Sequence, residues 1–200
     1  MPQHHAGDSS LKPTSAIPFL HLEIAKHNDS KHNKLFSRQV LSRGYEHWAQ
    51  RPIQDLAIVS HHYFETEPHC LVSLSHTHQK NLNLSATAVS LASKDHFLAI
   101  GVDLEHAGRK LPEQWQRHVL NDVDTTSPMG DLDIWCVKEA AFKSLWPLEK
   151  CPTLKSITVN AENASAGAFL GTGKFQGRFL TQKINMENET WLVALAWIQP

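Results

Sequence analysis

The sequence predicts a mixed α/β (α+β) fold, because helical and strand patterns both occur along the chain. Residues 132–146 are rich in good helix formers without Gly or Pro, and Pro147 ends the stretch. Residues 97–105 begin as an apolar run typical of a buried strand. Residues 83–92 alternate between two faces, as a strand does. At 200 residues and 41% hydrophobic content, the chain is large enough for a sizeable core.

The N-terminal part begins with residues 1–16, which are rich in polar residues, Pro and Gly, and which we expect to be disordered. A helix is predicted at about 31–50, capped by Asp29 or Ser30. Ser93-Lys94-Asp95 is predicted to form a hairpin turn into the strand at 97–105. The other strands predicted here lie at 17–24, 55–60 and 70–74.

The C-terminal part continues with a predicted short helix at about 112–120 and a polar segment at 121–130. After the helix at 132–146, a strand is predicted at 156–160 and a loop of small residues at 161–173. A closing antiparallel hairpin is predicted from strands at 174–184 and 190–197.

Charge and cysteine content narrow the classes of function. The formal net charge of −1 argues against bulk binding to nucleic acid or to an anionic membrane. Cys70, Cys136 and Cys151 are odd in number and lack metal-type spacing, which favours a reduced, intracellular protein. No apolar run approaches the length of a membrane span, and the N-terminus lacks a signal-peptide core. We therefore expect a cytoplasmic protein.

Carboxylates follow the apolar run of the strand at 97–105. Asp103 and Glu105 lie two apart and share one face, where they repel each other unless a cation lies between them. Oxygen ligands of this kind suit Mg²⁺, with Mn²⁺ as an alternative. Glu139 on the helix would be a third ligand. Glu139 and Lys143 lie about one turn apart on one face, so a solvated ion pair is the simpler interpretation.

Histidines cluster early in the chain, with eleven of the fourteen in the first eighty residues. This bias raises a metal site at His61 and His62, or at His76 and His78, as an alternative. The spacing does not match a structural zinc site, so we expect most of these side chains to lie at the surface.

Three motifs together resemble the 4'-phosphopantetheinyl transferase superfamily. Residues 101–105 (Gly-Val-Asp-Leu-Glu) resemble its first signature, and residues 135–143 (Trp-Cys-Val-Lys-Glu-Ala-Ala-Phe-Lys) resemble its second, in the family's order and at its spacing. Upstream, residues 75–77 (Ser-His-Thr) resemble a Ser-His-Ser segment of the larger members, with Thr77 in place of the last Ser. The resemblance covers roughly residues 70–160.

The resemblance implies a 4'-phosphopantetheinyl transferase fold of two similar α/β halves with pseudo-twofold symmetry. The halves would be residues 17–100 and 101–200, with the metal site in the second and the active site between them. The chain length is similar to that of the larger, monomeric surfactin-type group rather than to the short trimeric group that serves fatty-acid synthesis, which favours secondary metabolism.

The resemblance also implies an activity: Mg²⁺-dependent transfer of 4'-phosphopantetheine from coenzyme A to a serine of an acyl or peptidyl carrier protein, as in a holo-[acyl-carrier-protein] synthase. Asp103, Glu105 and Glu139 would hold Mg²⁺. Lys143 would lie on the same phosphate oxygens, and Glu139 or a metal-bound water would take the serine proton.

By the same resemblance, the residues that hold the phosphates of coenzyme A would be Arg38, Arg43, Ser75 and His76, together with Lys143. Lys138 lies about 100° from Glu139 around the helix, so its role is less defined: it would contact phosphate or an acidic, helical carrier.

Two alternatives stay open. The same acids and lysine also occur in the metal sites of other Mg²⁺-dependent phosphoryl-transfer enzymes, such as nucleases. The chain has no excess of basic residues, which counts against a nuclease. The other alternative is a non-catalytic relative that binds coenzyme A or a carrier protein without turnover.

Overall fold

The computed structural model describes residues 20–27, 33–53, 58–59, 63–79, 84–124, 127–150, 153–186 and 188–200. This part of the chain forms a mixed α+β fold with two antiparallel sheets and three α-helices. The predicted fold class is thereby confirmed at the level of a mixed α and β architecture.

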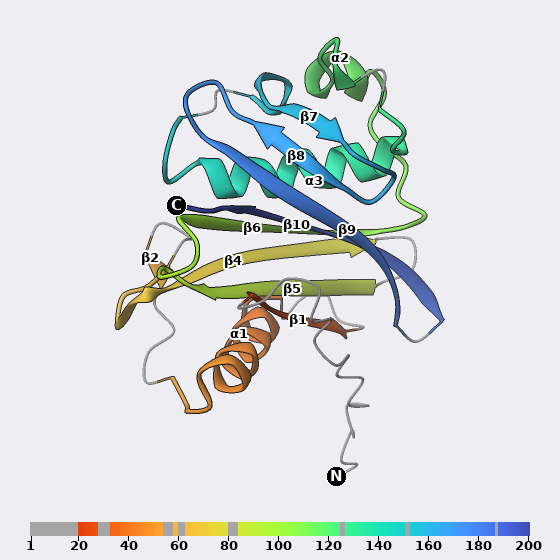
Figure 1. Cartoon of the computed structure of the whole chain (residues 1–200). Coiled ribbons are helices and arrows are strands. Elements are labelled where there is room, and N and C mark those ends of the chain that lie inside the picture. The colour runs from red at the N-terminus through yellow and green to blue at the C-terminus, as the bar shows by residue number, and fades with distance from the viewer. Residues whose placement is uncertain are drawn as a thin grey trace.

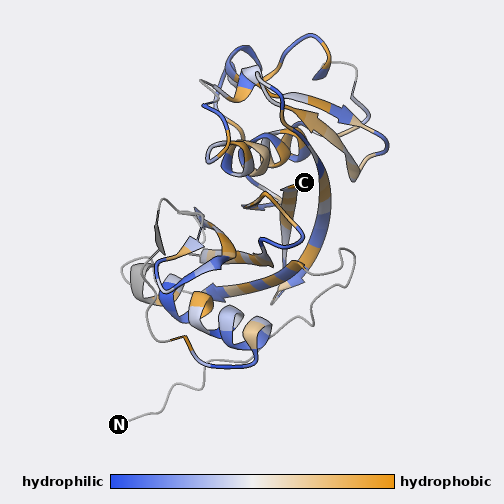
Figure 2. Cartoon of the chain, turned by 60° about the vertical axis from the view of Figure 1, so that its left-hand side comes forward, coloured by the Kyte–Doolittle hydropathy of each residue, from blue (hydrophilic) through white to orange (hydrophobic). Residues whose placement is uncertain are grey.

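The first sheet has five strands in the order β1-β5-β4-β3-β2. Its long strands alternate side chains between two faces, which gives the banding of hydrophilic and hydrophobic residues in Figure 2. Its strands are β1 (Leu20–His27), β2 (Ile58–Val59), β3 (Tyr63–Phe64), β4 (Glu67–Gln79) and β5 (Leu84–Ser93), and α1 (Asn33–Ala49) packs on β1 and β5.

The second sheet has five strands in the order β6-β10-β9-β8-β7. Helix α3 covers one face of this sheet and contacts β6, β10 and β9. Its strands are β6 (Ala99–His106), β7 (Thr158–Ala161), β8 (Ala166–Leu170), β9 (Gln176–Met186) and β10 (Glu189–Ile198), and the remaining helices are α2 (Trp115–Val119), α3 (Asp131–Leu145) and the 3-10 turn η4 (Leu154–Ser156).

The two sheets pack face to face between the two long helices. Figure 1 shows α1 below the first sheet and α3 above the second, with β6 lying across β4 and β5. Between the sheets, Ala86 and Ala88 of β5 share a buried cluster with Val102 and Leu104 of β6. Small side chains on one sheet and larger ones on the other allow this close approach.

The same strand order recurs in both sheets: the first strand lies at one edge, and the last strand lies beside it. In each half a long helix follows the first strand and packs on it. This repeat is what a fold of two similar halves requires. The boundary near residue 100 and the pseudo-twofold axis stay predictions, and residues 1–16 lie outside the described part.

Most predicted elements are present, and three predictions need correction. The segment 161–173, predicted as a loop, contains β8, and β3 was not predicted at all. The turn after β5 does not close a hairpin, because β5 already pairs with β1 and β4, and β6 pairs with β10 instead. The turn therefore carries the chain from the first sheet to the second.

No helix in the described part of the chain combines the length and the apolar character that a membrane span needs.

Candidate active site

Gly101 brings β6 and α3 close together at the centre of the candidate site. A Cβ atom on Gly101 would lie 1.9 Å from the carbonyl oxygen of Ala140 and 3.0 Å from the backbone nitrogen of Ser144. No side chain larger than hydrogen fits against the helix backbone here. This contact sets Glu139 and Lys143 of α3 close to the acids that follow Gly101 on β6.

Asp103 is almost fully buried, with 5% of its surface exposed. Its Oδ1 atom accepts hydrogen bonds from Ser75 Oγ at 2.9 Å and from Lys143 Nζ at 2.9 Å. Lys143 Nζ also donates to the carbonyl oxygen of Val102 at 2.9 Å. The second oxygen, Oδ2, is buried and has no hydrogen-bond partner among the described residues. A buried carboxylate oxygen without a partner is costly unless a cation or another donor satisfies it.

Glu105 lies two residues further along β6 and is buried to the same degree. Its Oε2 atom accepts a hydrogen bond from Thr77 Oγ1 at 2.9 Å, and its Oε1 atom pairs with the guanidinium of Arg109. That guanidinium stacks over the ring of Trp135, with 5.3 Å between Cζ and the ring centroid. Strand β4 of the first sheet thus supplies one hydroxyl to each acid of the second sheet.

Glu139 is partly exposed and is electrostatically coupled to this group. Burial raises the pKa of its carboxyl, and the nearby charge of Asp103 raises it further, against the opposing effects of Lys143 and Arg109. Burial and then Asp103 likewise raise the pKa of the Cys136 thiol well above its ordinary value, so this thiol stays protonated. Burial and the repulsion from Asp103 together therefore outweigh the stabilising effect of the two cations on ionised Glu139.

The donor set fits a hard divalent cation. Asp103, Glu105 and Glu139 offer only oxygen ligands, and Asp103 Oδ2 is left without a partner among the described residues. The three acids are nevertheless not drawn tightly together. In the described ranges, only His21, Glu23 and His47 form a set whose ligand atoms all lie within 4.8 Å of one another. Lys143 and Arg109 now occupy carboxylate oxygens that a cation would use.

The predicted coenzyme A contacts divide between two faces of the first sheet. Ser75 points to the acids, whereas the next residue, His76, points to the opposite face and is exposed. His76 pairs across the strands with Thr87, whose hydroxyl contacts Ser37, the neighbour of exposed Arg38. The structure therefore places His76 on the face of the first sheet that α1 covers, opposite to the face of Ser75, and Arg38 is exposed on α1.

Arg43 is engaged elsewhere on α1. Its Nε atom donates to Glu23 Oε1 at 2.6 Å, beside His21 and His47. Its predicted role at a phosphate stays a prediction, and holding one would require the guanidinium to leave this carboxylate.

Lys138 is a buried structural cation, which corrects its interpretation as a contact to phosphate or carrier. Its side chain is 0% exposed and pairs with Asp124. Nζ also donates to the carbonyl oxygens of Val119 and Ile157, both at 2.7 Å, and of Leu154 at 3.3 Å. Burial lowers the pKa of Lys138, and Asp124 opposes that effect. Lys138 joins α3 to the segments around α2 and η4.

Sequence reasoning missed two contributors to the site. Arg109 was not predicted to take part, although a positive residue four positions after Glu105 was an available signal. Thr77 was noted only as a substitution that keeps a hydroxyl, and this hydroxyl is the group that binds Glu105. The Thr77 contact joins strands of different sheets, and the position of Arg109 also depends on its packing over Trp135 of α3. Spacing along the chain reveals neither of these packing contacts.

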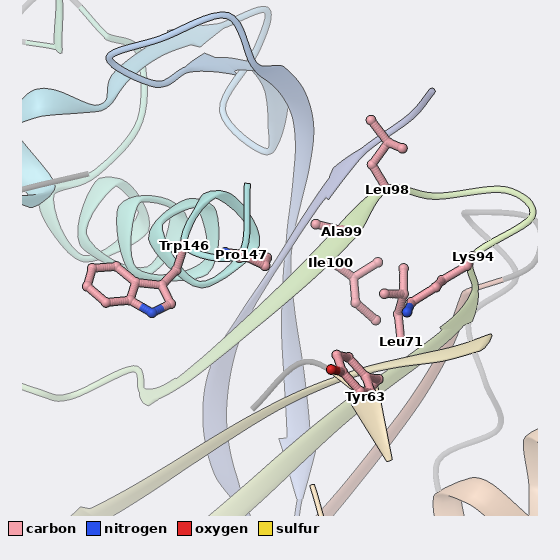
Figure 3. Close-up of a pocket in the computed structure, with 8 residues that line it drawn as sticks. All are labelled: Tyr63, Leu71, Lys94, Leu98, Ala99, Ile100, Trp146 and Pro147. Carbon is pink, nitrogen blue, oxygen red and sulfur yellow. The ribbon is translucent and has the colours of Figure 1, made fainter. Parts of the chain in front are cut away.

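A surface cavity of about 380 Å³ lies at the other end of the contact between β6 and α3. Figure 3 shows Lys94 and Tyr63 on one side of it and Trp146 on the other. The Lys94 amine lies 4.4 Å from the centroid of the Tyr63 ring. The described lining residues are Tyr63, Leu71, Lys94, Leu98, Ala99, Ile100, Trp146 and Pro147, so the carboxylates of the site do not line this cavity.

Comparison with known proteins gives no assignment for this site: no family model matches the chain, and no curated protein matches it significantly.

Proposed function

We propose that the chain transfers the 4'-phosphopantetheine arm of coenzyme A to a serine of an acyl or peptidyl carrier protein. The observation that carries the proposal is the arrangement around Asp103: its Oδ1 atom binds Lys143, its Oδ2 atom is buried without a partner among the described residues, and its charge acts on Glu139. Glu105 lies two residues further along the same strand. The motifs at 101–105 and 135–143, singled out by resemblance, supply these four residues.

The reaction requires one bond to form and one to break at phosphorus. The serine hydroxyl oxygen attacks the phosphorus that carries the pantetheine arm, and the bond to the bridging oxygen of the pyrophosphate breaks. Adenosine 3',5'-bisphosphate leaves with the electron pair. Negative charge grows on the bridging oxygen, so positive groups held beside it lower the barrier.

The acids fit a divalent cation, Mg²⁺ or Mn²⁺, which would supply charge neutralisation at the pyrophosphate when bound. Asp103, Glu105 and Glu139 would hold it. Lys143 is already aligned with Asp103 and adds a fixed positive charge to the same place. Arg109, anchored on Glu105 and stacked on Trp135, adds a second.

Glu139 fits the role of proton acceptor for the serine hydroxyl. It is the most exposed of the three acids, and its pKa is raised by burial and by Asp103. A carboxylate with a raised pKa is a stronger base than an ordinary one.

The fold expected for this activity has two similar halves, and the repeated strand order of the two sheets supports that part of the proposal. Hydroxyls from β4 of the first sheet reach acids on β6 of the second. Contributions from both sheets are what the proposed activity requires of a site between two halves.

The test is intact-mass spectrometry of apo carrier proteins incubated with coenzyme A, Mg²⁺ and this protein. The set would include fatty-acid, polyketide and peptide-synthetase carriers. We expect one carrier class to gain the mass of a phosphopantetheine arm, in a manner that needs Mg²⁺ and fails with Glu139→Gln. Glu46→Gln, an exposed glutamate on α1 and outside both motifs, is the matched control and should retain transfer.

Two results would count against the proposal. Binding of coenzyme A without transfer to any carrier would favour the non-catalytic alternative. If the chain neither binds coenzyme A nor modifies any carrier, the resemblance no longer guides the assignment of function.

A further inference from the structure

A second group of metal-ligating side chains lies on the opposite side of the molecule, between β1 and α1. His21 and Glu23 are two apart on β1, so both point to the face that α1 covers. His47, from the last turn of α1, joins them. Gly44 permits this approach, because a Cβ atom there would already lie 3.1 Å from Glu23 Cβ.

The distances from Glu23 to the two histidines are close to those of tetrahedral coordination. Glu23 Oε2 lies 3.6 Å from His21 Nε2 and 3.3 Å from His47 Nδ1. Ligands at zinc bond lengths of 2.0–2.1 Å in a tetrahedron are roughly 3.3–3.4 Å apart. A cation can therefore enter with only small movements of the side chains.

The surroundings of Glu23 orient its carboxylate. Arg43 Nε holds Oε1 at 2.6 Å and leaves Oε2 facing both imidazoles. A partner outside the coordination shell that orients a ligand in this way is typical of metal sites.

The two histidines differ in access to solvent. His21 Nε2 is buried and makes no hydrogen bond within the described part of the chain. The side chain of His47 is 53% exposed, so the group opens to water on the helix side. Three protein ligands and an open fourth position, which water can fill, are the usual composition of an accessible zinc site.

The place of this group in the fold corresponds to that of the acid site, by which we mean Asp103, Glu105, Glu139 and Lys143 between β6 and α3. In each half, two side chains spaced i and i+2 on the first strand of the sheet meet residues of the long helix packed on that strand. The second half supplies carboxylates there, and the first half supplies two imidazoles and one carboxylate. Nitrogen ligands shift the preference from Mg²⁺ to cations of the zinc class.

We propose that His21, Glu23 and His47 form a site for Zn²⁺ or a similar transition-metal cation, separate from the acid site. The cation links the edge strand β1 to α1 and stabilises the first half of the fold. The inference does not depend on the proposed transferase activity.

The test uses the full chain without a histidine tag, stripped of metal by a chelator and titrated with Zn²⁺ against a chromophoric chelator. We expect one tight site per chain that excess Mg²⁺ does not displace. Co²⁺ in the same site should give the visible absorption of tetrahedral coordination. Saturation with Zn²⁺ should raise the melting temperature, because the cation binds the folded state.

The variants His21→Ala and His47→Ala assign the ligands. Each should weaken Zn²⁺ binding by about 100-fold or more, since loss of a ligand costs at least as much as the 10–100-fold loss seen for supporting residues. His47 is half exposed, so its replacement leaves the packing of α1 intact. The controls are His118→Ala, an exposed histidine on α2, and the double variant His61→Ala/His62→Ala, whose residues lie outside the described part.

Retained Zn²⁺ affinity in both His21→Ala and His47→Ala would overturn the proposal. Loss of the site in the His61→Ala/His62→Ala variant would move it to that histidine pair instead. Absence of any tight Zn²⁺ site in the wild-type chain would also overturn it, whereas carrier modification by the same preparation would leave the transferase proposal standing.

Discussion

At the scale of single residues, the charge of Glu139 works against folding in the absence of a cation. Its pKa lies above the ordinary value of 4.5 because of burial and of Asp103. Between those two pKa values, the folded state holds a proton that the unfolded chain has released. The free energy of unfolding therefore falls as pH rises through this window.

The variant Glu139→Gln keeps the size of the side chain and removes this charge. Without Mg²⁺, we expect Glu139→Gln to be more stable than wild type at about pH 8, and the difference to shrink at about pH 4, where glutamate is largely protonated. Urea unfolding at both pH values measures the difference. Added Mg²⁺ should narrow it by stabilising wild type, and a stability gap that does not change with pH would contradict the linkage.

For the acid site, the sequence indicates which side chains share a face but not which groups surround them. Asp103 and Glu105 share a face because strand periodicity alone requires it, and Glu139 and Lys143 follow from helix periodicity. Lys138 has the same side-chain chemistry as Lys143, and only the packed structure distinguishes the buried lysine from the one at the site. The bonds from Ser75 and Thr77 depend on how the two sheets face each other, which no local pattern encodes.

At the scale of elements, the site depends on how closely α3 packs on β6. Gly101→Ala would place a methyl group against the backbone carbonyl of Ala140, an atom that cannot move without shifting the helix. We expect a loss of about 1–3 kcal/mol in the free energy of unfolding, as is usual for overpacking, together with loss of carrier modification.

Gly108→Ala is the matched control for this contact. A Cβ atom there would meet only ring atoms of His106 at 3.1 and 3.2 Å, and a side chain can adjust. We expect a change within about 0.5 kcal/mol. If urea unfolding shows the same loss of unfolding free energy for both variants, the close packing of α3 on Gly101 is not the cause of the loss.

Elements with long patterns were predicted well from the sequence, and short or small-residue strands were not. β5, β6 and α3 lie within two residues of their predicted bounds. β8 was not predicted, because Gly167 and its alanine neighbours have the composition of a loop. The sheet needs a small residue at this position, since a Cβ atom on Gly167 would lie 2.2 Å from the carbonyl oxygen of Asn160.

At the scale of the whole molecule, the two sheets share one core. Val193 of β10 packs in the cluster that also contains Ile24, Ala86 and Ala88 of the first sheet. Val193→Ala removes two methyl groups from this shared core, and we expect it to cost about 2 kcal/mol. Because both sheets contribute to the cluster, the loss should reach both long helices.

Hydrogen exchange measured by mass spectrometry tests this coupling. Amides of α1 and of α3 should lose protection by the same free energy in Val193→Ala, because they open in one cooperative unit. Loss of protection confined to α3 would indicate that the halves unfold independently.

The repeated path of the two sheets also has an evolutionary side. A chain that runs one strand order twice contains two places with similar backbone geometry, and selection on one of them leaves the other able to diverge. Carboxylates and an amine now occupy the place between β6 and α3, whereas imidazoles, a carboxylate and a guanidinium occupy the place between β1 and α1. One ancestral arrangement would thereby account for two chemistries within a single chain.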